Sequence, residues 1–110
     1  MTLDSEINII WTIMDKSHFV YIMANTDNGA LYIGDTSDLT RRVYQHKQDF
    51  IPGFSKNYKT HTLVYFRNAG GKQVALHYKK QLKHQRRKWK LSLIEKHNPG
   101  WKDLWEEIVR

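Results

Sequence analysis

Two short apolar runs separated by a tight turn constrain the fold of this chain more than any other feature of its sequence. Residues 19–24 (FVYIMA) and 30–34 (ALYIG) are rich in residue types that favour β-strands. Asn28-Gly29 lies between the two runs and supplies the positive φ angle that a tight hairpin needs. The sequence therefore predicts a β-hairpin near the start of the chain.

A helix is predicted after the hairpin. Residues 36–38 (TSD) offer side-chain oxygens that cap a helix beginning near Leu39. Leu39 is followed at helical spacing by Val43 and by either His46 or Phe50. Residues 51–61, with their Pro and Gly, predict a loop.

The second half of the chain predicts one more strand, two helices and a short amphipathic tail: residues 62–67, 73–84, 86–96 and 101–109. Val74, Tyr78 and Leu82 form the apolar stripe of the first of these helices. We expect the tryptophans at 89, 101 and 105 to pack in the core and the tail rather than to stack on bases. This order of elements predicts a small α+β domain, a three-stranded sheet with helices packed against it.

Length and composition favour one cytoplasmic domain. The chain has 110 residues, no Cys and no apolar run near the ~18 residues of a membrane span. The absence of Cys excludes disulfides, thiolate metal sites and a Cys nucleophile. We expect one domain over residues 14–110. Residues 1–13 form an extension that could be an added turn or strand, a homodimer contact, or a segment before the true start at Met14.

Positive charge is concentrated in the middle of the chain. Fourteen of the 18 Lys and Arg residues, but one of the 11 Asp and Glu residues, lie between residues 41 and 90. Nucleic acid is the polyanion that such a block most often contacts. DNA-backbone contacts are expected from four residues of the 79–90 run: Lys80, Lys83, Arg86 and Arg87. A well-solvated basic surface would give the same pattern, and both interpretations stay open.

Four side chains suit chemistry on a phosphodiester. Tyr21 and Tyr32 can face the same side of the hairpin, depending on its register, and Arg42 and His46 share one face of the next helix. Phosphoryl transfer needs a proton acceptor for the attacking water and a fixed positive charge for the phosphate oxygens. The alternative is that the tyrosines are ordinary strand residues and Arg42 is a surface cation.

The chain resembles the GIY-YIG endonucleases, in particular small single-domain members similar to the nuclease domain of the excinuclease C subunit. The resemblance covers residues 18–105 and rests on an ordered series of motifs: Val20-Tyr21-Ile22, Tyr32-Ile33-Gly34, Asp38-Leu39-x-x-Arg42-Val43-x-x-His46, Gly53-Phe54-Ser55-Lys56-x-Tyr58, Leu63-Val64-Tyr65-Phe66, Lys80-Gln81-Leu82-Lys83, Trp89-Lys90, Leu93-Ile94-Glu95 and Asn98-Pro99-x-Trp101-x-Asp103-Leu104. It implies a three-stranded antiparallel sheet flanked by helices.

The resemblance also implies roles for individual residues. Tyr21, hydrogen-bonded near Tyr32, would be the general base or would position the water. Arg42 would stabilise the pentavalent phosphate, and His46 would shape the same pocket. Three further residues would lie against the nucleic acid: Gly34, through close approach of its backbone to the phosphate, and Lys56 and Tyr58, through contacts to the backbone.

The family also has a glutamate on the helix after the third strand, which holds one Mg²⁺ or Mn²⁺ at the leaving oxygen. Relatives read Arg-Glu-Lys-Gln-Leu-Lys there, whereas this chain reads Tyr-Lys-Lys-Gln-Leu-Lys at residues 78–83, so Lys79 occupies the glutamate position. An ammonium group cannot bind a divalent cation. No Asp or Glu occurs between Arg67 and Lys90 to replace the lost ligand.

Asp35 is the nearest acidic residue in the motif region, and three interpretations of it are open. It could form an ion pair with Lys79 in place of the glutamate–metal unit, or it could recruit a metal itself. We take as the default that Asp35 is a solvated loop acid beside the N-terminus of the following helix, where negative charge is favourable.

Three functions are therefore considered. The first is a metal-dependent endonuclease acting on DNA phosphodiesters, whose activity the Lys79 substitution argues against. The second is a nucleic-acid-binding module on the same scaffold, without catalysis. The third is a protein-interaction domain that dimerises through residues 1–13 and the C-terminal tail.

Overall fold

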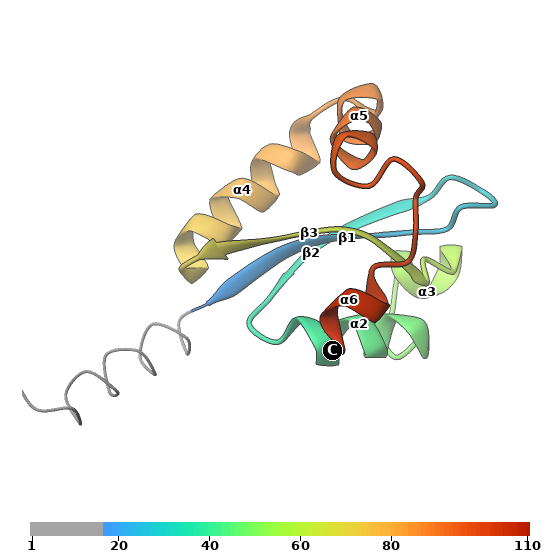
Figure 1. Cartoon of the computed structure of the whole chain (residues 1–110), viewed down its shortest axis with the longest axis horizontal. Coiled ribbons are helices and arrows are strands. Elements are labelled where there is room, and N and C mark those ends of the chain that lie inside the picture. The colour runs from blue at the N-terminus through green and yellow to red at the C-terminus, as the bar shows by residue number, and fades with distance from the viewer. Residues whose placement is uncertain (1–16) are drawn as a thin grey trace, which may run out of the picture.

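The computed structural model describes residues 17–110 and contains one three-stranded antiparallel sheet with helices on both faces (Figure 1). The strands are β1 (His18–Ala24), β2 (Leu31–Thr36) and β3 (Thr62–Gly70), in the order β2-β1-β3. The helices are α2 (Leu39–Lys47), α3 (Phe54–Tyr58), α4 (Lys72–His84), α5 (Arg87–His97) and α6 (Trp105–Ile108). The predicted α+β class is confirmed.

The predicted extension at residues 1–13, and the homodimer contact expected of it, lie outside the described residues. Within residues 17–110, no helix has the length and apolar character required to cross a bilayer.

The hairpin of β1 and β2 forms as predicted. The loop between the strands closes through hydrogen bonds from the Gly29 amide to the Asn25 carbonyl at 2.8 Å and from the Asn25 amide to the Ala30 carbonyl at 3.0 Å. Gly29 has a φ of +75°, a value that only glycine adopts without strain. Met23 pairs with Tyr32 in this register. Because alternate residues of a strand share a face, Tyr21 and Tyr32 lie on the same side of the sheet.

The central strand β1 is buried on both faces, which divides the core in two. Val20, Ile22 and Ala24 pack with Ala75 and Leu82 of α4. On the opposite face, five residues of the sheet and α2 form the second cluster, against which α6 packs: Tyr21, Met23, Leu39, Val43 and Leu63. Figure 1 shows the same division, with α4 and α5 on one side of the sheet and α2, α3 and α6 on the other. Each large aliphatic side chain buried here contributes about 1.5–3 kcal/mol.

Helix α2 begins where the sequence predicted, because the Asp38 carboxylate accepts a hydrogen bond from the Arg41 amide at 3.1 Å. The uncertain position in its apolar stripe is decided in favour of His46, which is buried, whereas Phe50 is 64% exposed. The loop predicted for residues 51–61 is wrong in its centre, since α3 forms there. Local sequence hides this helix because it has only five residues, and Lys59 ends it in the left-handed conformation.

Three further expectations need correction. Strand β3 continues three residues beyond the predicted Arg67. Ala75 replaces Val74 in the buried stripe of α4, and Val74 is 59% exposed. Trp89 does not pack in the core but is 44% exposed, whereas the other two tryptophans of this region pack against the core as expected. The rotation of α4 and α5 is set by their contacts with the sheet, which a periodicity within one helix does not define.

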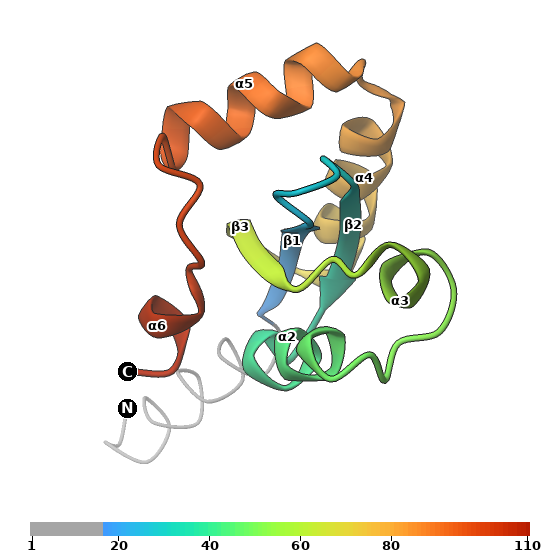
Figure 2. The same ribbon diagram turned by 90° about the vertical axis from the view of Figure 1, so that its right-hand side faces the viewer.

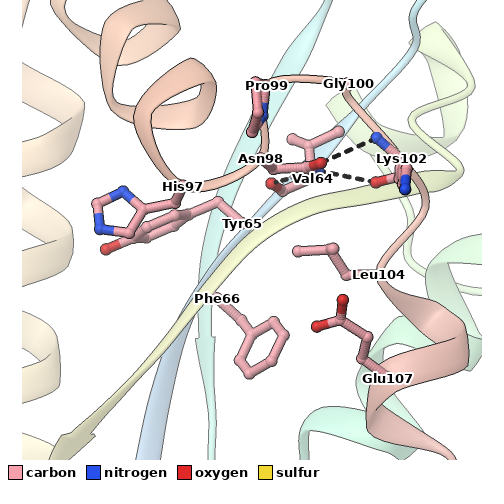
Figure 3. Close-up of a pocket in the computed structure, with 10 residues that line it drawn as sticks. All are labelled: Val64, Tyr65, Phe66, His97, Asn98, Pro99, Gly100, Lys102, Leu104 and Glu107. Carbon is pink, nitrogen blue, oxygen red and sulfur yellow. Dashed lines mark hydrogen bonds between the residues drawn. The ribbon is translucent and has the colours of Figure 1, made fainter.

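The C-terminal segment runs from α5 past the β3 edge of the sheet to α6 on the other face (Figure 2). Its backbone joins the edge strand β3, since the Leu104 amide donates to the Leu63 carbonyl at 2.8 Å. The Asn98 amide group donates to the carbonyls of Val64 at 3.2 Å and Lys102 at 2.9 Å, and its oxygen accepts from the Lys102 amide (Figure 3). A pocket of about 380 Å³ lies beside these hydrogen bonds, away from the four residues predicted to act on phosphate.

Candidate active site

Tyr21, Tyr32 and His46 lie together on the α2 face of the sheet, as the sequence predicted. The ring centroids of Tyr21 and Tyr32 are 6.3 Å apart, and those of Tyr32 and His46 are 4.7 Å apart. The Tyr21 hydroxyl is 2.7 Å from Nε2 of His46. This hydrogen bond forms because α2 carries the His46 ring to the end of the Tyr21 side chain, with 5.4 Å between the ring centroids.

His46 continues into a buried chain of hydroxyl groups. Its Nδ1 is 2.7 Å from Oγ of Ser55, and that oxygen is 2.6 Å from Oγ1 of Thr60. The Thr60 hydroxyl reaches the Ser55 carbonyl at 3.5 Å. These three side chains are each at most 1% exposed. These hydrogen bonds therefore connect the Tyr21 hydroxyl to buried hydroxyl groups on α3 and just after it.

The donors of this chain follow from the tautomer of His46. In the tautomer that carries its proton on Nδ1, the Tyr21 hydroxyl donates to Nε2 of His46. Nδ1 then carries the imidazole proton and donates to Ser55, Ser55 donates to Thr60, and Thr60 donates to the Ser55 carbonyl. Every hydroxyl has one acceptor in this arrangement. In this tautomer, His46 is a neutral base aimed at the Tyr21 proton.

The environment keeps Tyr21 and His46 uncharged at neutral pH. Burial, and next the nearby Tyr32, raise the pKa of Tyr21 far above its usual range. Burial, and next the positive charge of Arg42, lower the pKa of His46 to about 4. Arg42 also acts on Tyr21, since its charge favours the phenolate. The arrangement places a cation beside a phenol whose proton has a neutral acceptor.

Arg42 itself lies half-buried on α2 and lines a surface pocket of about 320 Å³ together with Thr36, Ser37 and Arg41. The polar pocket opens beside the N-terminus of α2. Two guanidinium groups and the Ser37 hydroxyl suit an oxyanion such as a phosphate, and the Asp38 carboxylate is the one acidic group that lines the pocket.

Gly34 has a structural role that the sequence did not predict. It pairs with Tyr21 across the β1–β2 ladder. A Cβ atom built on Gly34 would lie 2.5 Å from the Tyr21 hydroxyl oxygen and 2.9 Å from a ring carbon of Tyr32. In this structure the missing side chain of Gly34 makes room for the tyrosines, and close approach of a phosphate to the Gly34 backbone stays a prediction.

Asp35 lies on the opposite face of the sheet, where it binds Lys79 of α4. The Lys79 ammonium forms an ion pair with one carboxylate oxygen, and Nε2 of His18 is 2.7 Å from the other. Both partners of the ion pair are largely buried, with side chains 22% and 16% exposed. Burial opposes ionisation of Asp35, but the hydrogen bonds from Lys79 and His18 outweigh it and lower its pKa. The expectation of a solvated loop acid is therefore wrong, because Asp35 belongs to β2 and faces α4.

The donor groups of this region do not fit a divalent cation. An ammonium group occupies the position at which the motif series leads us to expect a glutamate, and both Asp35 oxygens already have partners. In the described part of the chain, no three His, Cys, Asp or Glu side chains are grouped closely enough to bind one metal ion. A cation placed here would have to displace Lys79 from its carboxylate.

The residues predicted to contact nucleic acid lie on three surfaces. Lys56 and Tyr58 are exposed on α3, where the Tyr58 ring stacks on Phe54 with 4.4 Å between centroids. Lys80 and Lys83 are exposed along α4, and Arg86 and Arg87 are exposed at the start of α5. Arg87 also binds the hairpin loop, donating to the Gly29 carbonyl at 2.5 Å.

Sequence reasoning missed three residues of these clusters: His18, Ser55 and Thr60. The hairpin register could have indicated His18, because alternation along β1 puts it on the same face as Val20, and Val20 pairs with Asp35. No local signal identifies Ser55, whose partner His46 lies on another helix, or Thr60, which joins the cluster through Ser55.

Comparison with known proteins gives a family match that covers most of the chain. The model of the GIY-YIG catalytic domain family matches residues 17–103. Two proteins named UPF0213 protein, from two strains of Staphylococcus epidermidis, are each 35% identical over 82 residues, which cover 74% of this chain and 98% of the relative. No solved structure gives a significant match. The chain belongs to the GIY-YIG family.

Proposed function

We propose that this chain is a nucleic-acid-binding GIY-YIG domain in which an ion pair has replaced the metal-binding unit of the family. The observation that carries the proposal is the bond between Lys79 and Asp35. GIY-YIG nucleases are generally metal-dependent. Loss of the metal ligand removes several kcal/mol of transition-state stabilisation, enough to leave little hydrolysis.

Binding would use two sets of cations. Arg42 and its polar pocket would hold one phosphate near Tyr21. Lys80 and Lys83 are exposed on α4 and take part in no ion pair among residues 17–110, so they are available to contact phosphates on the α4 face of the sheet. Such contacts carry little base specificity, and we expect weak sequence preference. DNA is the proposed ligand.

A second candidate function is favoured by the hydrogen-bonded chain behind Tyr21. A domain that only binds has no need for a buried neutral histidine aimed at a phenol proton. In an endonuclease, the Tyr21 oxygen would accept a proton from the attacking water while its own proton moves to Nε2 of His46. Arg42 would stabilise the charge that develops on the phosphate oxygens.

Cleavage and binding assays on the same variants separate the two functions. We would incubate labelled single- and double-stranded DNA with Mg²⁺ or Mn²⁺ and the wild type, Lys79→Glu or Arg42→Ala. Lys72→Glu is the matched control, because it makes the same charge change at an exposed position of the same helix that is assigned no contact with DNA. Circular dichroism would establish that each variant is folded.

The proposal expects a wild type that binds DNA in a salt-dependent way and does not cut it. It also expects Lys79→Glu, but not Lys72→Glu, to gain metal-dependent cleavage. Cleavage by the wild type that is lost in Arg42→Ala would establish the endonuclease and refute the disabling role of Lys79. A wild type that binds no DNA at low salt would refute both candidates.

A further inference from the structure

The corner between α4 and α5 contains a pocket that the proposed function does not use. The pocket has a volume of about 520 Å³ and is lined by His84, Gln85, Arg86, Lys88, Trp89 and Ser92. Gln85 and Arg86 have extended backbones, which turn the chain between the helices. The corner is held to the hairpin loop by the bond from Arg87 to the Gly29 carbonyl.

Trp89 is the unexplained feature of this pocket. Its indole is 44% exposed, although Ile94 on the same helix is completely buried. A large aromatic side chain left partly in water beside a pocket is typical of a ligand-binding surface.

The other groups of the pocket define the charge of the ligand. Arg86 and Lys88 are exposed and form no ion pair with any residue of the 17–110 range, and no acidic side chain lines the pocket. Gln85 and Ser92 add neutral groups that can donate and accept hydrogen bonds. An aromatic face with two unpaired cations is complementary to a flat π system attached to a phosphate.

We infer that this pocket binds one unpaired nucleobase of a DNA strand, stacked on Trp89, with the adjoining phosphates on Arg86 and Lys88. The inference rests on the proposed nucleic-acid binding and deepens it, because it names the strand state that is bound. Every base has a π face, so stacking tolerates any sequence. A base within a duplex already has both faces covered, and the pocket therefore selects single-stranded segments or strand ends.

Two DNA probes test the inference: a fluorescein-labelled 12-nucleotide oligo-dT and a closed duplex hairpin without overhangs. Fluorescence anisotropy would compare the wild type with Trp89→Ala and Trp89→Phe. Val74→Ala is the control, since it truncates another exposed apolar residue on the neighbouring helix α4. The indole signals in ¹H–¹⁵N spectra, assigned through Trp89→Phe, would be followed during titration with oligo-dT.

We expect Trp89→Ala to weaken oligo-dT binding by about 5- to 100-fold. Trp89→Phe should recover most of this loss, Val74→Ala should match the wild type, and duplex binding should change less than twofold in all variants. Oligo-dT should shift the Trp89 indole signal more than those of the other tryptophans. Equal effects of Trp89→Ala on both probes, or none on oligo-dT, would refute the inference while leaving the proposed function in place. A wild type that binds neither probe would refute both.

Discussion

Gly34 lies directly opposite Tyr21 in the β1–β2 pair, and the Tyr21 ring occupies the space that a side chain on Gly34 would need. Gly34 of the Tyr32-Ile33-Gly34 motif thus leaves the space that Tyr21 of the Val20-Tyr21-Ile22 motif occupies. This contact keeps the Tyr21 hydroxyl in position for its 2.7 Å hydrogen bond to His46.

Gly34→Ala should lower the free energy of unfolding by about 1–3 kcal/mol, because the new methyl group overlaps the Tyr21 side chain. Urea denaturation would measure the loss. Gly100→Ala is the control, since its Cβ would lie an ordinary 3.6 Å from the Lys102 side chain. Equal losses in the two variants would contradict the steric explanation.

His46 should make stability depend on pH. Its pKa is about 4 in the folded protein and about 6.5 in an unfolded chain, so the unfolded state takes up the proton first as pH falls. Stability is therefore fully present above pH ~6.5 and decreases toward pH ~4, by at most about 3 kcal/mol.

Denaturant unfolding of the wild type, His46→Gln and His77→Gln at several pH values between 4 and 7.5 would test this. We expect His46→Gln to have the flatter profile and His77→Gln, an exposed residue of α4, to match the wild type. A profile for His46→Gln as steep as that of the wild type would assign the pH dependence to other groups.

The ion pair between Asp35 and Lys79 should show energetic coupling. In a double-mutant cycle with Asp35→Asn and Lys79→Met, we expect about 1–3 kcal/mol, because the pair is largely but not fully buried. Lys59 and Asp49 provide a comparison, since their pair is 3.3 Å long and exposed at the lysine. Their coupling should be smaller, because water screens the exposed lysine, and a reversed order of the two values would be inconsistent with the structure.

Asn98→Ala should release the C-terminal segment from β3. The variant loses the side-chain hydrogen bonds to Val64 and Lys102 and leaves buried backbone groups without partners. The expected loss of stability is about 2–4 kcal/mol. Hydrogen exchange should become faster at the Leu104 amide, whereas Asn57→Ala, an exposed change on α3, should leave it unaltered.

Lys83→Gln should weaken DNA binding in a way that depends on salt. Each lost phosphate contact lowers the slope of log K against log[salt] by about 0.7–0.9. Anisotropy titrations at NaCl concentrations from about 50 to 300 mM would measure this slope. Lys102→Gln, beside the β3 edge of the sheet, is the matched control and should keep the wild-type slope.

Local sequence was sufficient for the parts of the fold that neighbouring residues create. The Asn28-Gly29 turn predicted the hairpin, the Asp38 cap predicted the start of α2, and the apolar run after residue 61 predicted β3. These features depend on hydrogen bonds and backbone angles within a few residues. Alternation along the strands also predicted that Tyr21 and Tyr32 could share a face, and the register of the hairpin confirms it.

Tertiary structure alone decided which side chains become partners. Asp35 and Lys79 are 44 residues apart, and the packing of α4 on β2 brings them together instead of leaving Asp35 in solvent. In the same way, α2 and α3 join His46 to Ser55, and the crossing of α5 over the sheet leaves Trp89 exposed. Such pairings depend on the rotation and placement of whole elements, which the residue pattern within any one element does not specify.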